Sequence, residues 1–338
     1  MTYRERILTA IGGEKPDRVP VSPFGLGHLN PNSAAAAELI TKTDPFISAG
    51  ISGNSFMGEL FQSESRQEGN DTVTTIVTPK GNLTQRYRRT HVTGCMIEFP
   101  CKNAEDVEKY LSIPFQPSDP NVEGFLTRRA EIGEEGLVLA GIGDAICLPA
   151  TILSPEDMCL LWIEAPELMQ WLVDLAAERV NAFVETARQK GVDAYRIVGG
   201  EYATAQLGPR GFNALVSIIH KYGGIAYYHN HGAVDRFLEG FAEPGVDALD
   251  PLEVPPYGNI DLADAKHQIG DRVCLVGGLD DMEILESLAE ETVKVMARKC
   301  IEAAGTDGYC LGGAASGTHT EKTAQNFIAL VEVALEYA

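Results

Sequence analysis

The sequence is poor in positive charge. Its 338 residues hold 27 Lys and Arg against 48 Asp and Glu, which gives a formal net charge of −21 at pH 7. A nucleic-acid-binding protein gains affinity by neutralising phosphates with basic side chains, so this balance argues against a nucleic-acid partner. No apolar run approaches the roughly 20 residues of a membrane-spanning helix, and the opening MTYRERILTAIGGEKPDR is charged where a signal peptide has an apolar core. The sequence therefore predicts a cytoplasmic protein without a membrane partner.

Several short motifs are also missing. The seven cysteines are scattered, odd in number and never spaced as Cys-x-x-Cys, which argues against a disulfide framework or a zinc knuckle. GLGHL at 25–29 and GIGDA at 141–145 lack the third glycine of a dinucleotide-binding turn, and no Walker A sequence occurs. The chain therefore carries no sequence signal for a bound dinucleotide or nucleoside triphosphate.

What the sequence does contain, from about residue 136, is a regular alternation of apolar strands and amphipathic helices every 25 to 35 residues. One predicted helix begins at Pro166 and ends at Gly191, positions that suit a first turn and a stop. Such alternation is typical of a parallel sheet covered by helices. The length favours a single domain over 1–338 of the α/β class, a (β/α)8 TIM-type barrel.

The first 135 residues are less regular and predict an N-terminal elaboration together with the first barrel units. TVTTIVT at 72–78 and LTQRYRRT at 83–90 are rich in β-forming residues and flank the turn PKGN. This arrangement predicts a β-hairpin.

Chemically useful side chains gather at the predicted strand ends, where barrel enzymes place their active sites. His229 and His231 lie two residues apart in IAYYHNH, so both face one side of an extended strand. With Glu201 and Cys310 from other strand ends they could form the shell of a catalytic zinc ion, which takes three protein ligands and keeps one position open. The alternative is that one histidine is a hydrogen-bonded core residue and the other binds substrate directly.

The strand-end motifs IVGGEYATAQLGPRGF, GGIAYYHNHG and GVDALDPLEVPPYGN, with the opening TYRERILTAIGGEKPDRVPVSPF, resemble the uroporphyrinogen decarboxylase superfamily. The resemblance spans nearly the whole chain and implies a distorted (β/α)8 barrel. Porphyrin-decarboxylating members carry an Arg-Gln-Ala-Gly-Arg segment near the N-terminus, whereas VSPFGLGHLNPNS here has no arginine. The resemblance therefore favours the zinc-dependent, corrinoid-linked methyltransferase branch.

Zinc methyltransferases of this superfamily have His-x-Cys-Gly where this sequence has His229-Asn230-His231-Gly232, so His231 replaces a cysteine. Their further cysteine would align with Gly312, two positions from Cys310. The resemblance implies Glu201 as the replacement ligand, and Asp250 would orient a ligand histidine. A harder shell of histidine and carboxylate suits a metal that polarises an ether oxygen.

The resemblance and this ligand set together predict an O-demethylase component that moves a methyl group from an aryl methyl ether to the cobalt(I) corrinoid of a partner protein. The chain has no Asp-x-His-x-x-Gly cobalt-binding motif, so the corrinoid would come on that partner. Tyr202, Tyr228 and Tyr257 are the predicted lining of the substrate pocket, and a homodimer is expected. The alternatives are methyl transfer from the corrinoid to a thiol or folate, and a metal-free decarboxylase.

Overall fold

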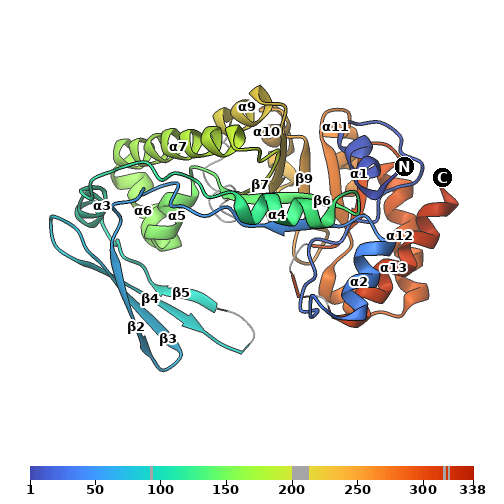
Figure 1. Ribbon diagram of the computed structural model, residues 1–338, viewed down its shortest axis with the longest axis horizontal. Coiled ribbons are helices and arrows are strands. Elements are labelled where there is room, and N and C mark those ends of the chain that lie inside the picture. The colour runs from blue at the N-terminus through green and yellow to red at the C-terminus, as the bar shows by residue number, and fades with distance from the viewer. Residues whose placement is uncertain (92–93, 200–212, 315–316, 319) are drawn as a thin grey trace.

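The centre of the molecule is a parallel β-sheet that curls toward a barrel (Figure 1). The computed structural model describes residues 1–338 apart from 92–93, 200–212, 315–316 and 319. The seven strands run in the spatial order β1 (Phe46–Ala49), β6 (Leu137–Gly143), β7 (Ala194–Val198), β8 (Ile225–His229), β9 (Ala248–Leu252), β10 (Cys274–Gly278) and β11 (Tyr309–Gly312). Every neighbouring pair is parallel. The predicted α/β class is confirmed, and the sheet is consistent with a TIM-type barrel.

Residues 20–25 link the two edges of this sheet. On one side the Ser22 amide donates to Leu311 of β11 at 2.8 Å, and on the other the Phe46 amide of β1 donates to Pro23 at 3.0 Å. Isolated parallel bridges join Val21 to Leu311 and Phe24 to Phe46. The segment thus occupies the place of a further strand, and it brings the side chains of Ser22 and Phe24 to the inside of the curled sheet.

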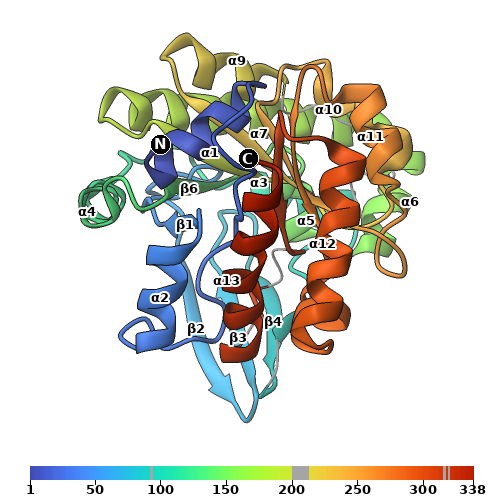
Figure 2. The same ribbon diagram turned by 90° about the vertical axis from the view of Figure 1, so that its right-hand side faces the viewer.

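Helices cover the outer face of the sheet. Figure 2 shows α2, α13 and α12 side by side over one part of it, and α7 runs along another part in Figure 1. The predicted helix at 166–191 is confirmed as α7, whose apolar residues recur every three or four positions and are buried. The helices of this layer are α2 (Ala34–Lys42), α4 (Glu123–Ile132), α7 (Pro166–Gln189), α9 (Asn213–Lys221), α10 (Leu238–Ala242), α11 (Leu262–Ile269), α12 (Glu290–Ala304) and α13 (Glu321–Glu336), with short turns at η1 (Asp235–Phe237) and η2 (Asp281–Glu286). Helix α1 (Tyr3–Ile11) instead packs Ile7 and Ala10 into the interior cluster of the barrel.

A second, antiparallel sheet extends away from the barrel in Figure 1. It consists of β2 (Ser63–Glu68), β3 (Asp71–Ile76), β4 (Leu83–Arg89) and β5 (Gly94–Glu98) in that order. The predicted hairpin is confirmed as β3 and β4, and strands on both sides extend it. A separate apolar core forms where this part meets α3 (Ala104–Leu111), α5 (Cys147–Ile152), α6 (Pro155–Glu164) and the start of α7.

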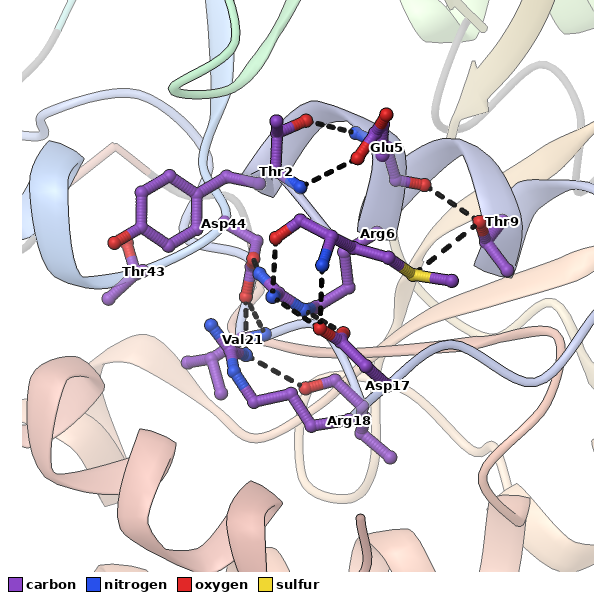
Figure 3. A network of polar contacts seen from close by, with 12 residues as sticks. Thr2, Glu5, Arg6, Thr9, Asp17, Arg18, Val21, Thr43 and Asp44 are labelled. Carbon is purple, nitrogen blue, oxygen red and sulfur yellow. Dashed lines mark hydrogen bonds and ion pairs between the residues drawn. The ribbon is translucent and has the colours of Figure 1, made fainter.

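A buried charge network fixes the N-terminal segment to the sheet (Figure 3). Asp44, which precedes β1, has no exposed surface and accepts from Arg6 Nη1 and Arg18 Nη1, each at 2.6 Å, and from the Val21 amide at 2.9 Å. Buried carboxylates are tolerated when they are paired and hydrogen-bonded in this way. Asp44 therefore holds residues 20–25 against β1, at the joint between the sheet edges.

Among the described residues, no helix is long and apolar enough to cross a bilayer.

Candidate functional site

Alternation along β8 decides which side chains reach the inside of the barrel. Tyr227 packs on Phe46 in the interior cluster, with ring centroids 4.8 Å apart, whereas Tyr228 packs on Phe241 in the layer beneath the helices, at 5.1 Å. Successive side chains of a strand point to opposite faces, so His229 lies on the interior face with Tyr227. The carboxyl end of β8 thus presents an imidazole to the mouth of the barrel, where barrel enzymes hold their active sites.

His229 forms a buried pair with Asp250 of the neighbouring strand β9. The two residues are in register, and Nδ1 of His229 lies 2.8 Å from Oδ2 of Asp250. Their exposed fractions are 5% and 1%. Burial lowers the pKa of His229, and the Asp250 carboxylate opposes this. A neutral imidazole whose Nδ1–H donates to the carboxylate presents Nε2 to the barrel mouth as the basic, ligating atom.

His231 has a carboxylate partner of its own in Glu253. Its Nδ1 lies 3.0 Å from Oε1 of Glu253, and the Gly232 amide donates to the other carboxylate oxygen at 2.7 Å. Burial acts to raise the pKa of Glu253, but the hydrogen bonds from His231 and Gly232 outweigh it, and the pKa is lowered. Gly232 has φ +92°, a conformation that glycine adopts at no steric cost, so the sharp turn after His231 depends on it.

The two imidazoles lie together, with ring centroids 4.6 Å apart and planes perpendicular. Both are oriented through Nδ1 by a carboxylate from the β9 region, which is the arrangement commonly found behind metal-ligating histidines. The residues present therefore fit two of the three protein ligands of a catalytic zinc site. Within the described part of the chain, no three His, Cys, Asp or Glu side chains come close enough to form a complete metal cluster.

A cavity of about 430 Å³ opens beside this pair. Pockets that hold small molecules typically measure about 300–1,000 Å³. Tyr257 is exposed on its wall and donates a hydrogen bond to Glu283 at 3.1 Å. The wall is made by His231, Gly232, Glu253, Tyr257, Asp280, Asp281, Met282 and Ala314. The cavity is therefore acidic on one side and in direct contact with one of the two imidazoles.

The other predicted site residues have different locations. Tyr228 is fully buried on the outer side of the strand, and its hydroxyl donates to Asp144 at 2.8 Å. Cys310 is fully buried inside the barrel, with its Sγ 3.9 Å from that of Cys274, and this neighbour and burial raise its pKa. The structure does not bring Cys310 into a metal cluster with the histidines. Glu201 and Tyr202 lie outside the described residues.

Three charged groups at or near the barrel interior were not predicted from the sequence. Glu253 follows β9 by one residue, and Asp144 follows β6 by one residue. Burial raises the pKa of Asp144 to about 6, although the Tyr228 hydroxyl favours its charged form. The strand-end rule that selected Asp250 would also have selected these two. Arg196, the third, is the one charged side chain in the apolar strand β7, and alternation alone indicates an unusual interior position.

Comparisons with known proteins agree with this architecture. Residues 73–337 match the family model described as Uroporphyrinogen decarboxylase (URO-D). Two relatives named Methylcobamide:CoM methyltransferase MtaA, from Methanosarcina barkeri (strain Fusaro / DSM 804) and from Methanosarcina barkeri, are each 24% identical over 322 residues, which covers 89% of this chain and 89% of each relative. A solved structure of a methyltransferase from Methanosarcina mazei covers 100% of this chain and 99% of its own, with a TM-score of 0.65 at 16% identity. That likeness shows a shared fold. Because the family model matches well over half of the chain, the resemblance is confirmed and this protein belongs to the uroporphyrinogen decarboxylase family.

Proposed function

We propose that this protein is a corrinoid-dependent methyltransferase that takes the methyl group of an aryl methyl ether and passes it to the cobalt(I) corrinoid of a partner protein. The pair of carboxylate-oriented imidazoles at the carboxyl end of β8 carries the proposal. The methyltransferase part draws support from the relatives named methylcobamide:CoM methyltransferase, which the chain matches over 89% of their length.

Zinc would be held by His229 and His231, with Glu201 as the third ligand. The fit rests on the two histidines, because each has its Nδ1 engaged by a carboxylate. When bound, zinc supplies Lewis acidity to the ether oxygen, which makes phenolate a better leaving group. The replacement of a family cysteine by His231 favours an oxygen-containing substrate, because a shell without sulfur is harder.

The protein's own residues would orient the ligands and the substrate. Asp250 and Glu253 fix the ring orientations of His229 and His231, and the burial of the first pair keeps water from competing for the carboxylate. Tyr257 and Met282 offer an aromatic and a soft apolar surface on the cavity wall. In the reaction, the carbon–oxygen bond breaks with its electron pair left on oxygen, which then takes a proton. The cobalt(I) electron pair forms the new methyl–cobalt bond.

Transfer in the opposite direction, from a methyl-corrinoid to a small thiol, is the second candidate function, and the names of the two relatives favour it.

An assay of phenol release distinguishes the two directions of transfer. The protein is incubated with a cobalt(I) corrinoid protein and a panel of aryl methyl ethers, and free phenol is measured. Phenol release supports demethylation. Thiol methylation without phenol from any ether would overturn it in favour of the second candidate.

The metal is tested separately, on protein purified without a histidine tag. About one zinc per chain is expected, together with its loss in His229→Ala and in His231→Ala. Less than a few tenths of a zinc per chain in the wild type, or unchanged zinc in both variants, would refute the proposed site and favour a metal-free decarboxylase.

A further inference from the structure

Arg196 occupies an unusual position inside the barrel. It lies in the middle of β7, paired with Tyr227 of β8, and it shares the inward face of its strand with Ala194 of the interior cluster. Its guanidinium carbon sits 4.0 Å from the centroid of the Phe24 ring, which residues 20–25 bring to the inside. Arg196 is half-buried, so the side chain retains some access to solvent.

Among the described residues, the Arg196 guanidinium has no acceptor, unlike three other arginines that are wholly or partly buried. Arg6 and Arg18 bind Asp44, and Arg179 donates to the Phe56 carbonyl at 2.7 Å. Across the residues that the structure describes, Arg196 has no ion pair or hydrogen bond, and its Nε is buried without a partner. Only the Nε–H is shown to be buried, and leaving such a donor without an acceptor costs free energy even though the side chain as a whole keeps some contact with solvent. Burial lowers the pKa of Arg196, but arginine keeps its charge in proteins.

Tyr227, which pairs with Arg196 across the two strands, has a buried hydroxyl with no hydrogen-bond partner among the described residues. The same holds for the hydroxyl of Ser22, in the segment that carries Phe24, and the Tyr227 ring lies 6.3 Å from the Phe24 ring. Burial raises the pKa of Tyr227, so its hydroxyl keeps its proton and remains a donor. The inside of the barrel thus offers a cation and two hydroxyls beside an aromatic ring. Together they match a planar organic anion.

Asp250 does not act as an ion-pair partner for the Arg196 guanidinium. Its charge favours the charged guanidinium, but the two side chains form no ion pair within 4.0 Å, and the Asp250 carboxylate is engaged by His229. Val198 and His229 are in register, and Arg196 lies two residues before Val198 on the same face. Two residues of a strand span about 6.6 Å, comparable with a para-substituted benzene ring. A substrate anchored at Arg196 can therefore reach the imidazole pair.

We propose that Arg196 binds the anionic group of the substrate, so that the protein acts on small organic anions, with carboxylated aryl methyl ethers as the methyl donors. This inference rests on the proposed function for the identity of the reacting group. The anion itself could be the carboxylate of such a donor or the sulfonate of a small thiol acceptor. The experiment has an arm for each.

The test is calorimetric binding without any corrinoid, so that it does not depend on turnover. The ligands are 4-methoxybenzoate, its neutral analogue 4-methoxybenzamide, and 2-mercaptoethanesulfonate. Wild type should bind one of the two anions, with the carboxylate at least ~20-fold tighter than the amide if that is the natural class. Arg196→Met should weaken the favoured anion by ~20- to 100-fold and leave the amide unchanged, and Arg196→Lys should retain part of the affinity.

Arg179→Met is the matched control. Arg179 also stacks on an aromatic ring at 4.0 Å and has a buried Nε without a partner, but it lies outside the barrel mouth. Its variant should bind the anion like the wild type. If wild type binds neither anion, or binds acid and amide equally, or if Arg196→Met retains affinity within 2-fold, the inference is overturned.

The result also separates the inference from the proposed function. Arg196-dependent binding of 4-methoxybenzoate without phenol release in the corrinoid assay would refute demethylation and leave the anion site standing. Phenol release from neutral and anionic ethers at equal rates, unaffected by Arg196→Met, would support demethylation and refute the anion site at Arg196. Tight binding of the sulfonate alone would assign the site to a thiol acceptor.

Discussion

Asp250 is the residue whose replacement tests the site most directly. Asp250→Asn keeps the size of the side chain and removes its charge, so the amide no longer selects the tautomer with Nδ1–H on His229. The proposed zinc ligand would then lose the group that fixes its ring and increases its basicity. We expect zinc to bind more weakly while the barrel stays folded.

The size of the effect follows from the geometry. The His229–Asp250 contact is short, at 2.8 Å, and both residues are almost fully buried, so water does not replace the lost interaction. A hydrogen bond to a charged group contributes roughly 1.5–3 kcal/mol, which corresponds to about 10- to 150-fold in an equilibrium constant. Loss of the carboxylate behind a metal-ligating histidine typically costs about 10- to 100-fold in metal affinity. The expected weakening is therefore about 10- to 100-fold.

The assay is competition for zinc between the apoprotein and a chromophoric chelator, with circular dichroism to verify the fold. Asp247→Asn is the matched control, because Asp247 contacts His220 at the same 2.8 Å but outside the barrel mouth, where His220 is exposed. It should leave zinc affinity unchanged. Zinc affinity within 3-fold of wild type in both Asp250→Asn and Asp250→Ala would show that His229 is not a ligand oriented by Asp250.

Three further perturbations have expected outcomes. Glu253→Gln should weaken zinc binding in the same chelator assay by up to about 10-fold, less than Asp250→Asn because His231 is more exposed than His229; no change would argue against His231 as a ligand. Burial raises the Asp144 pKa from 3.8 to about 6, so its contribution to stability is present below pH 3.8 and is lost as pH rises through 6. Relative to Asp144→Asn, the wild type should lose roughly 2 kcal/mol of unfolding free energy between pH 4 and 7, measured by urea denaturation; parallel pH profiles would contradict this. Asp44→Asn should lower the unfolding free energy by about 3–5 kcal/mol, because it leaves buried guanidinium groups without their shared anion; a loss below 1 kcal/mol in urea titrations would disprove the role of the network.

Much of the fold could be predicted from local patterns. The helix at 166–191 and the hairpin around 79–82 were predicted because hydrophobic periodicity and turn residues act over short distances along the chain. The position of His229 and His231 at a strand end followed in the same way, since the apolar run before them is what makes β8. Tyr228 and His229 are successive residues of β8, so their side chains point to opposite faces of the sheet. The prediction that Tyr228 lines the pocket together with the histidines is therefore inconsistent with strand alternation.

The tertiary structure decided what depends on register between distant segments. The pairing of β8 with β9 brings Asp250 to His229 and Glu253 to His231, and no spacing within one strand specifies such partners. The depth of Cys310, beside Cys274 and below the barrel mouth, depends on where β11 ends relative to β10. Arg196 is the single charged residue of an apolar strand, and only the packed barrel shows that the described residues around it offer its guanidinium no acceptor. Local patterns thus determined which side chains stand at the strand ends, and long-range packing determined which of them meet.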